Sequence, residues 1–230
     1  MNEDLKGNFS RRLLAWWKKN KRDFTWRYTN DPYAVLVAEL LLQKTNAEKV
    51  EPVYLEFMRR FPTIRKLQRA SIHEITEVIT PLGLFYRAVR ISHVADAIAN
   101  TFDGVVPNTP EELLTLPGVG SYMMNAILCF AFGQPRPLID TNSTRVLTRV
   151  FGLNPSKTRP RTDRQLWAFA SSLVPALYAK EYNWALIDLA HLVCMPAKPL
   201  HTECPVRTIC STVQEQEPDG RVPDPLRQVF

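Results

Sequence analysis

The sequence lacks long apolar runs and contains little cysteine. No segment approaches the run of about 18 apolar residues that a membrane span requires, and the first residues, MNEDLKGNFSRR, contain no apolar region of the kind found in signal peptides. Only four cysteines are present, and a chain of 230 residues buries a core without disulfides. We therefore expect a soluble intracellular protein that contacts no membrane.

Two structural patterns are also missing. These are the alternation of apolar and polar residues that is typical of strands, and any repeat of about 20 to 50 residues. Apolar residues recur instead at the spacing of a helix face. The predicted helices cover 8–20, 33–42, 52–61, 64–70, 71–78, 86–102, a segment that begins at residue 121, 141–151, 163–177 and 184–193. The expected fold class is all-α.

The positive charge is concentrated in two segments of the chain. The net charge is +6, with an isoelectric point of about 9.2. Residues 1–30 carry eight Lys or Arg against three acidic residues, and residues 134–167 carry seven against two. If the fold brings these segments together, they form a binding surface for a polyanion. If it does not, they are two solvated helix faces, and charge alone does not decide.

The segment LPGVGS, residues 116–121, joins two predicted helices. Gly118 and Gly120 allow a tight turn, after which the main-chain N–H groups at the start of the next helix point outward and suit one phosphate group. Ordinary turns between antiparallel helices can use the same pattern. The surrounding residues are needed to decide between the two interpretations.

Other motifs lie in order along the chain. They are FTWR at 24–27, DPY at 31–33, AELLLQKT at 38–45, LGLFYRA at 82–88 and LIDTNSTRV at 138–146, where Asp140 follows Gly120 by twenty residues. The LPGVGS segment corresponds to the turn of a helix-hairpin-helix motif and is called the hairpin below. Together with the hairpin, these motifs make the chain resemble the helix-hairpin-helix DNA glycosylases of the endonuclease III and MutY superfamily over about residues 8–210. The resemblance implies that Asp140 is catalytic rather than only a helix cap.

Three positions distinguish the subfamilies. Enzymes like endonuclease III that also cleave the strand carry a nucleophilic lysine where this chain has Tyr122, which cannot form a Schiff base. Glu39 matches the catalytic glutamate of MutY-type adenine glycosylases and archaeal thymine-DNA mismatch glycosylases, although a glutamate in an apolar helix can also be a paired structural carboxylate. Asn142 matches the same two groups. The combination of Glu39, Tyr122 and Asp140 most resembles the thymine mismatch enzymes.

The resemblance implies a monofunctional DNA N-glycosylase of base excision repair, with little or no AP lyase activity, that removes T or U opposite G. One alternative is an adenine glycosylase acting on A opposite G or 8-oxoguanine, although the chain ends at Phe230 without the additional domain with which those enzymes inspect 8-oxoguanine. A second alternative is a DNA-binding helix-hairpin-helix module without activity, against which Asp140 and Glu39 argue.

The implied mechanism flips the target nucleotide out of the duplex. Asp140 stabilises positive charge on the sugar and orients or deprotonates water, while Glu39, whose apolar helix favours the protonated form, protonates or hydrogen-bonds the leaving base. Tyr122 packs on the flipped base or donates its hydroxyl. Contacts with DNA are expected from Gln43, Lys44, Leu84, Gly118, Val119, Gly120, Ser121, Asn142 and Arg145, with Leu84 as an apolar wedge that fills the vacated stack.

Three of the four cysteines follow the last predicted helix. The iron-sulfur loop of the family has four cysteines separated by six, two and five residues, and Cys194, His201, Cys204 and Cys210 keep these separations with histidine in second place. We therefore expect a [4Fe-4S] cluster held by three thiolates and one imidazole. Zinc, or a loop without metal, is the alternative. Cys129 lies on an apolar helix and is expected in the core.

Two helical domains are expected, with a DNA and base cleft between them. One covers 31–138 and contains the hairpin; the other combines 1–30 with 139–210 and contains the metal loop, and 211–230 is a tail. This arrangement would bring both basic segments to one DNA-facing side. The expected partner is double-stranded DNA with a mismatched base, bound by a monomer in the cytoplasm or nucleoid.

Overall fold

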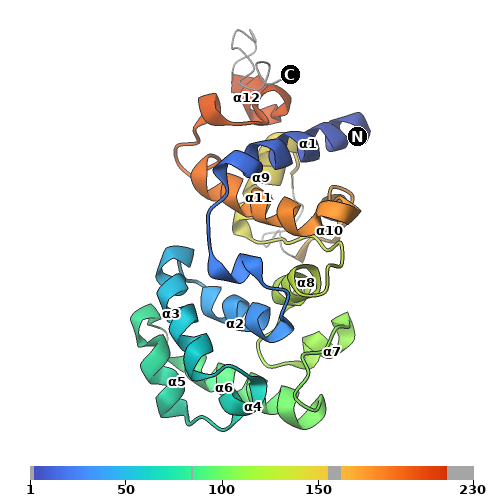
Figure 1. Cartoon of the computed structure of the whole chain (residues 1–230). Helices are drawn as coiled ribbons and strands as arrows, with labels where there is room; N and C mark the ends of the chain where they lie inside the picture. Colours follow the sequence, from blue (N-terminus) through green and yellow to red (C-terminus); the bar gives the residue numbers. More distant parts are fainter. Residues whose placement is uncertain (1–2, 84, 155–161, 217–230) are drawn as a thin grey trace. The chain divides into compact units, whose positions relative to one another are not determined.

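The computed structural model describes residues 3–83, 85–154 and 162–216, and every regular element within them is a helix (Figure 1). The predicted all-α class is thus confirmed. The α-helices are α1 (Glu3–Asn20), α2 (Pro32–Leu42), α3 (Ala47–Arg60), α4 (Ile64–Gln68), α5 (Ile72–Ile79), α6 (Tyr86–Thr101), α7 (Pro110–Thr115), α8 (Ser121–Phe130), α9 (Thr141–Phe151), α10 (Arg164–Ser171), α11 (Ala179–Leu192) and α12 (Ser211–Gln216). The 3-10 helices are η1 (Thr25–Tyr28), η2 (Thr80–Leu82), η4 (Ala176–Tyr178), η5 (His201–Glu203) and η6 (Arg207–Ile209). No described helix is both long and apolar enough to cross a membrane.

The chain divides into two compact units. The hairpin unit is Asp23–Gln134, and the terminal unit combines Met1–Arg22 with Pro135–Phe230. The sequence predicts the borders at 31 and 138 instead. The segment before α2 lies in the hairpin unit because η1 packs there: the Trp26 and Tyr54 rings meet edge to face at 5.5 Å, and the Thr25 N–H donates to Glu51 at 3.0 Å.

Helix α2 is buried on all sides within the hairpin unit. Every residue from Tyr33 to Leu41 is buried, and α2 packs against η1, α3 and α8. The helix begins where the sequence predicts, because Asp31 accepts a hydrogen bond from the Tyr33 N–H and Pro32 occupies the first turn. Glu39 is therefore an acidic side chain inside an apolar helix, and it is 7% exposed.

The remaining helices of the hairpin unit complete its core. Helix α6 packs on α4 and α5, and α7 packs on α8. Helix α3 begins at Ala47, because Asn46 caps it by accepting from the Glu48 N–H. The predicted start of this helix at Pro52 is wrong, since the proline lies inside the helix.

The terminal unit is built from segments far apart in the sequence. Helix α1 packs on α11, which packs on α9 (Figure 1). The Phe9 ring of α1 meets the rings of Phe151 and Tyr182 edge to face, at 5.1 and 6.3 Å. The core of this unit therefore depends on residues from both ends of the chain.

The predicted tail, 211–230, begins with a packed helix. Residues Ser211–Gln216 form α12, which packs on α9, and Val213 is buried in the core of the terminal unit. Its apolar contact explains why these residues are folded rather than a tail. Residues 217–230 lie outside the described part of the chain.

A buried carboxylate ties α11 to the end of α1. Asp188 is 0% exposed. It accepts hydrogen bonds from the Trp17 indole at 2.8 Å and from the Arg22 Nε at 2.7 Å and main-chain N–H at 3.2 Å. The charge of Asp188 is thus paired and hydrogen-bonded, as burial requires.

Candidate active site

The turn between α7 and α8 has the geometry that its glycines predict. The Val119 N–H donates to the Leu116 carbonyl at 3.1 Å. Gly118 has φ of +76°, which L side chains rarely adopt, and a Cβ there would lie 2.5 Å from Cδ of Arg90. The backbone conformation and the neighbouring arginine both favour glycine at 118.

Helix α8 starts without a side-chain cap. Gly120 occupies the N-cap position and offers no side chain to the first N–H groups of the helix. Gly118, Gly120 and Ser121 are exposed, whereas the Val119 side chain is buried. Uncapped N–H groups at an exposed helix start suit an anionic oxygen, so the hairpin can bind one phosphate group.

Asp140 is the N-cap of α9. One carboxylate oxygen accepts from the Ser143 N–H at 2.7 Å, while the Asp140 N–H donates to the Ser143 hydroxyl at 2.8 Å. The side chain is half-buried. The start of a helix is a favourable position for a negative charge, and these hydrogen bonds orient the carboxylate.

Asn142 and Arg145 connect Asp140 by hydrogen bonds to the segment that follows α11 in the same unit. Asn142 Nδ2 donates to the second Asp140 oxygen at 3.1 Å, and Arg145 Nη1 donates to Asn142 Oδ1 at 3.1 Å. Arg145 also donates to the carbonyls of Cys194, at 2.8 Å, and Ala190, at 2.9 Å. Three donors of Arg145 are therefore used within the protein, although the sequence predicts a contact with DNA.

Glu39 and Tyr122 lie on two packed helices of the hairpin unit. Glu39 is on the buried helix α2, and Tyr122 is in the first turn of α8, where its side chain is half-buried. Asp140 belongs to the terminal unit. Tyr122 and the hairpin N–H groups thus share one helix start.

Gln43 and Lys44 follow the last turn of α2. Gln43 is half-buried, and Lys44 is exposed with φ of 57°. Arg87, 1% exposed, holds this loop by donating to the carbonyls of Leu41 and Gln43, at 2.6 and 2.9 Å, and to the Thr45 hydroxyl, at 2.8 Å. Burial lowers the pKa of Arg87. Leu84, the predicted wedge, lies outside the described residues.

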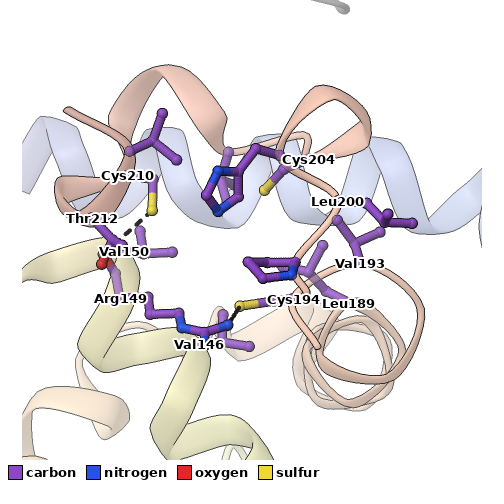
Figure 2. A pocket seen from close by; sticks show the side chains of 14 residues that line it. Val146, Arg149, Val150, Leu189, Val193, Cys194, Leu200, Cys204, Cys210 and Thr212 are labelled. Atoms are coloured by element: carbon purple, nitrogen blue, oxygen red, sulfur yellow. Dashed lines mark hydrogen bonds between the residues drawn. The ribbon is translucent and has the colours of Figure 1, made fainter. Parts of the chain in front are cut away.

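The four predicted metal ligands line one pocket of the terminal unit. Cys194, His201, Cys204 and Cys210 share this pocket with apolar side chains such as Val146 and Leu189. Figure 2 shows the sulfur atoms of the three cysteines directed toward its interior. Among the described residues, no three Cys, His, Asp or Glu side chains are grouped so that they could hold a metal ion.

Burial raises the pKa of Cys204 to about 12, and it also raises the pKa of Cys210. Arg149 donates to the Cys194 sulfur at 3.5 Å and accepts at its carbonyl from the Cys210 thiol at 3.3 Å. Buried thiols become thiolates when a cation binds them. Three thiols and an imidazole around an apolar pocket are a donor set that fits an iron-sulfur cluster.

Comparison with known families decides the identity of the fold. A model described as HhH-GPD superfamily base excision DNA repair protein matches residues 37–172, a range that includes Glu39, Tyr122 and Asp140. The chain belongs to the HhH-GPD superfamily. The resemblance inferred from the motifs is thereby confirmed.

Similar proteins of this superfamily are DNA glycosylases. The thymine/uracil-DNA glycosylase of Pyrobaculum aerophilum is 41% identical over 89% of this chain and 91% of that protein. The adenine DNA glycosylase of Homo sapiens is 36% identical over 89% of this chain but only 39% of that protein. The solved structure of a thermostable thymine-DNA glycosylase matches with a TM-score of 0.87 at 32% identity, over 92% of this chain and 98% of that one.

Sequence reasoning missed two arginines of this HhH-GPD protein. Arg87 and Arg90 lie on α6 and bond to the loop that contains Gln43. The predicted helix 86–102 includes both residues, but their partners are main-chain carbonyls, one hydroxyl and one side-chain amide, all distant in sequence. The available signal was the placement of Arg87 beside Ala88 and Ile91 on the buried face of that helix.

Proposed function

We propose that the chain is a monofunctional DNA glycosylase that hydrolyses the N-glycosidic bond of thymine or uracil opposite guanine. The observation that carries the proposal is the set of candidate catalytic groups within each unit. The terminal unit contains an oriented carboxylate at the start of α9, and the hairpin unit contains a buried glutamate and a tyrosine at the start of α8. The 41% identity to a thymine/uracil-DNA glycosylase supports the same substrates.

Asp140 stabilises the positive charge that develops on the sugar as the base departs. Each of its oxygens accepts one hydrogen bond from α9. A carboxylate offers about four lone-pair positions, so it keeps capacity to orient a water molecule for attack. The electrostatic role does not require the carboxylate to move, because the helix start already fixes its direction.

Glu39 assists the departure of the base. Glu39 is buried within the apolar helix α2. In its protonated form the carboxyl can donate a proton or hydrogen bond to a pyrimidine oxygen, where negative charge grows as the bond breaks. Tyr122, which follows the hairpin, packs against the base or donates its hydroxyl.

The absence of AP lyase activity is part of the proposal. Strand cleavage by this class of chemistry needs an amine that forms a Schiff base with the sugar. The residue two positions after Gly120 is Tyr122, whose phenol cannot form one. Water is therefore the nucleophile, and the product is an abasic site in an intact strand.

The metal loop is proposed to hold a [4Fe-4S] cluster through Cys194, His201, Cys204 and Cys210. The separations of six, two and five residues between these positions match the iron-sulfur loop of the family, which supports a cluster over zinc. When bound, the cluster would cross-link the two ends of the loop between α11 and α12.

The proposed partner is double-stranded DNA with a mismatched base, bound by one copy of the chain. The uncapped start of α8 provides a phosphate site, and the basic segments 1–30 and 134–167 provide sequence-independent attraction.

A panel of duplexes tests the function. The protein is incubated with G·T, G·U, A·G, A·8-oxoguanine and A·T pairs, and alkali then reveals abasic sites. Release of T and U from G mispairs only is the expected result. Asp140→Asn serves as the matched control for contaminating glycosylases, because it keeps the cap of α9 while it removes the charge.

An adenine glycosylase is the second candidate. The 36% identity to the human adenine DNA glycosylase favours it, since that enzyme resembles nearly the whole of this chain. Release of adenine from A·G or A·8-oxoguanine, without release of T or U, would select this candidate.

A further inference from the structure

Two arginines of α6, Arg87 and Arg90, hold the loop that follows α2. Arg87 binds the Gln43 carbonyl and the Thr45 hydroxyl, so the main chain of the loop is held even though Lys44 has a left-handed conformation. Arg90 Nη1 donates to Oε1 of the Gln43 side chain at 2.8 Å. The backbone and the side chain of Gln43 therefore have separate restraints.

The bond from Arg90 determines which way the Gln43 amide faces. A guanidinium has only donors, so the atom that it contacts must be the amide oxygen and not the nitrogen. The amide nitrogen, with its two N–H donors, then points away from Arg90, and no described residue accepts from it in the hydrogen bonds of the structure. Gln43 is thus presented as a donor.

Arg90 also lies against the hairpin. Its Cδ and Nε occupy the space in which a Cβ at Gly118 would stand, at 2.5 and 2.7 Å, and its guanidinium lies over the Tyr86 ring at 5.7 Å. One side chain therefore spans from the phosphate-binding turn to Gln43.

We propose that Arg90 is a positioning residue that presents Gln43 to DNA as an obligate hydrogen-bond donor, and thereby sets the preference for guanine opposite the excised base. The inference rests on the proposed function. Guanine carries two acceptors, O6 and N7, on its major-groove edge, and adenine shares only N7. A fixed donor at O6 matches guanine but not adenine, which carries an amino donor at that position, whereas an amide free to rotate can offer its oxygen and does not discriminate.

The test measures excision of uracil, and equilibrium binding, opposite guanine, opposite 2-aminopurine, which lacks O6, and opposite 7-deazaguanine, which lacks N7. For the wild type we expect about a fivefold loss opposite 2-aminopurine and none opposite 7-deazaguanine, the factor that corresponds to one hydrogen bond of about 1 kcal/mol. In Arg90→Ala the reaction opposite guanine falls by about the same factor, and the difference between guanine and the analogue disappears.

A second pair of variants separates positioning from folding. Gln43→Glu keeps the shape and still accepts from Arg90, but it has no donor for DNA, so it should lose the same discrimination. Combining it with Arg90→Ala should cause no further loss, because both changes remove one interaction. Arg90→Lys, which retains a group with donors only, should keep part of the preference. If Arg90→Ala fails to fold, the discrimination between guanine and the analogue measured in Gln43→Glu alone tests the proposal.

A direct contact of Arg90 with a phosphate is the competing explanation. Loss of a phosphate contact weakens binding to all duplexes equally and reduces the salt slope by about one, whereas loss of positioning changes the preference and leaves the slope intact. Arg59→Ala removes an exposed arginine of the same unit and controls for net charge. A uniform loss with a reduced slope, or unchanged discrimination in Arg90→Ala, would overturn the proposal.

The same measurements separate the two proposals. Failure of the wild type to release uracil from any duplex would overturn the proposed function, while the binding measurements still report on Arg90. Release of uracil together with equal binding and excision opposite guanine and both analogues would overturn only the role of Arg90 and Gln43.

Discussion

The side-chain amide of Asn142 donates a hydrogen bond to the carboxylate of Asp140, 3.1 Å away, at the start of α9. The amide cannot face the other way, because Arg145 donates to its oxygen at 3.1 Å. Arg145 in turn binds the carbonyl of Cys194 at 2.8 Å. A continuous path of hydrogen bonds therefore joins the proposed catalytic carboxylate to the main chain of Cys194, one of the proposed metal ligands.

The first prediction concerns the charge of Asp140. Asp140→Asn keeps an oxygen that can accept from the Ser143 N–H, and aspartate and asparagine are equally good helix caps. We expect the excision rate to fall by about a thousandfold or more, with unchanged thermal unfolding and with mismatch affinity retained. Single-turnover kinetics and equilibrium binding measure the two effects. An Asp140→Asn variant that works at near wild-type rate would remove this residue from the mechanism.

The second prediction concerns Arg145. Arg145→Ala removes the donors that bind the carbonyls of Ala190 and Cys194, so we expect the free energy of unfolding to fall by about 2 kcal/mol. Excision should slow as well, because Asn142 is then free to rotate away from Asp140. Denaturant unfolding and single-turnover kinetics are the measurements. DNA affinity measured at several salt concentrations provides the control, since a lost phosphate contact would reduce the salt slope by about one.

Local signals in the sequence predict the elements that position the candidate site. Helix α9 has the predicted bounds, because Asp140 caps its start and Gly152, in the left-handed conformation, ends it. The start of α3 could not be placed in the same way, since Pro52 is a stronger visible signal than Asn46. Arg87 escaped prediction for a different reason: its partners are carbonyls that only the folded loop brings to it.

The third prediction follows from Tyr122. Borohydride reduction during the reaction should trap almost no covalent complex with DNA, and strand cleavage should require added alkali, because no amine occupies this position. An enzyme of the superfamily with AP lyase activity provides the positive control. Efficient trapping would show that a lysine acts as nucleophile, and its loss in Lys44→Ala would identify which one.

The fourth prediction concerns the metal loop. Purified protein should be yellow-brown and contain iron and sulfide in equal amounts, because the three thiols and the imidazole of this loop are proposed to bind a [4Fe-4S] cluster. His201→Cys should retain the cluster at least as well, whereas Cys204→Ala should lose it. Colourless protein with stoichiometric zinc would support the zinc alternative. Protein without either metal, and with unchanged unfolding after chelation, would show that packing alone holds the loop.

The fifth prediction compares two ion pairs that have the same length but differ in burial. The Arg22 and Asp188 atoms are 2.7 Å apart with the carboxylate 0% exposed, and the Arg59 and Glu56 atoms are also 2.7 Å apart with both side chains exposed. Asp188→Ala leaves the Trp17 indole and the Arg22 guanidinium without their acceptor in the interior, so we expect a loss of about 3 kcal/mol or more in the free energy of unfolding. Glu56→Gln should leave the denaturant midpoint where it is, because water replaces the contact. Equal midpoints for the two variants would mean that Asp188 does not hold α11 to the end of α1.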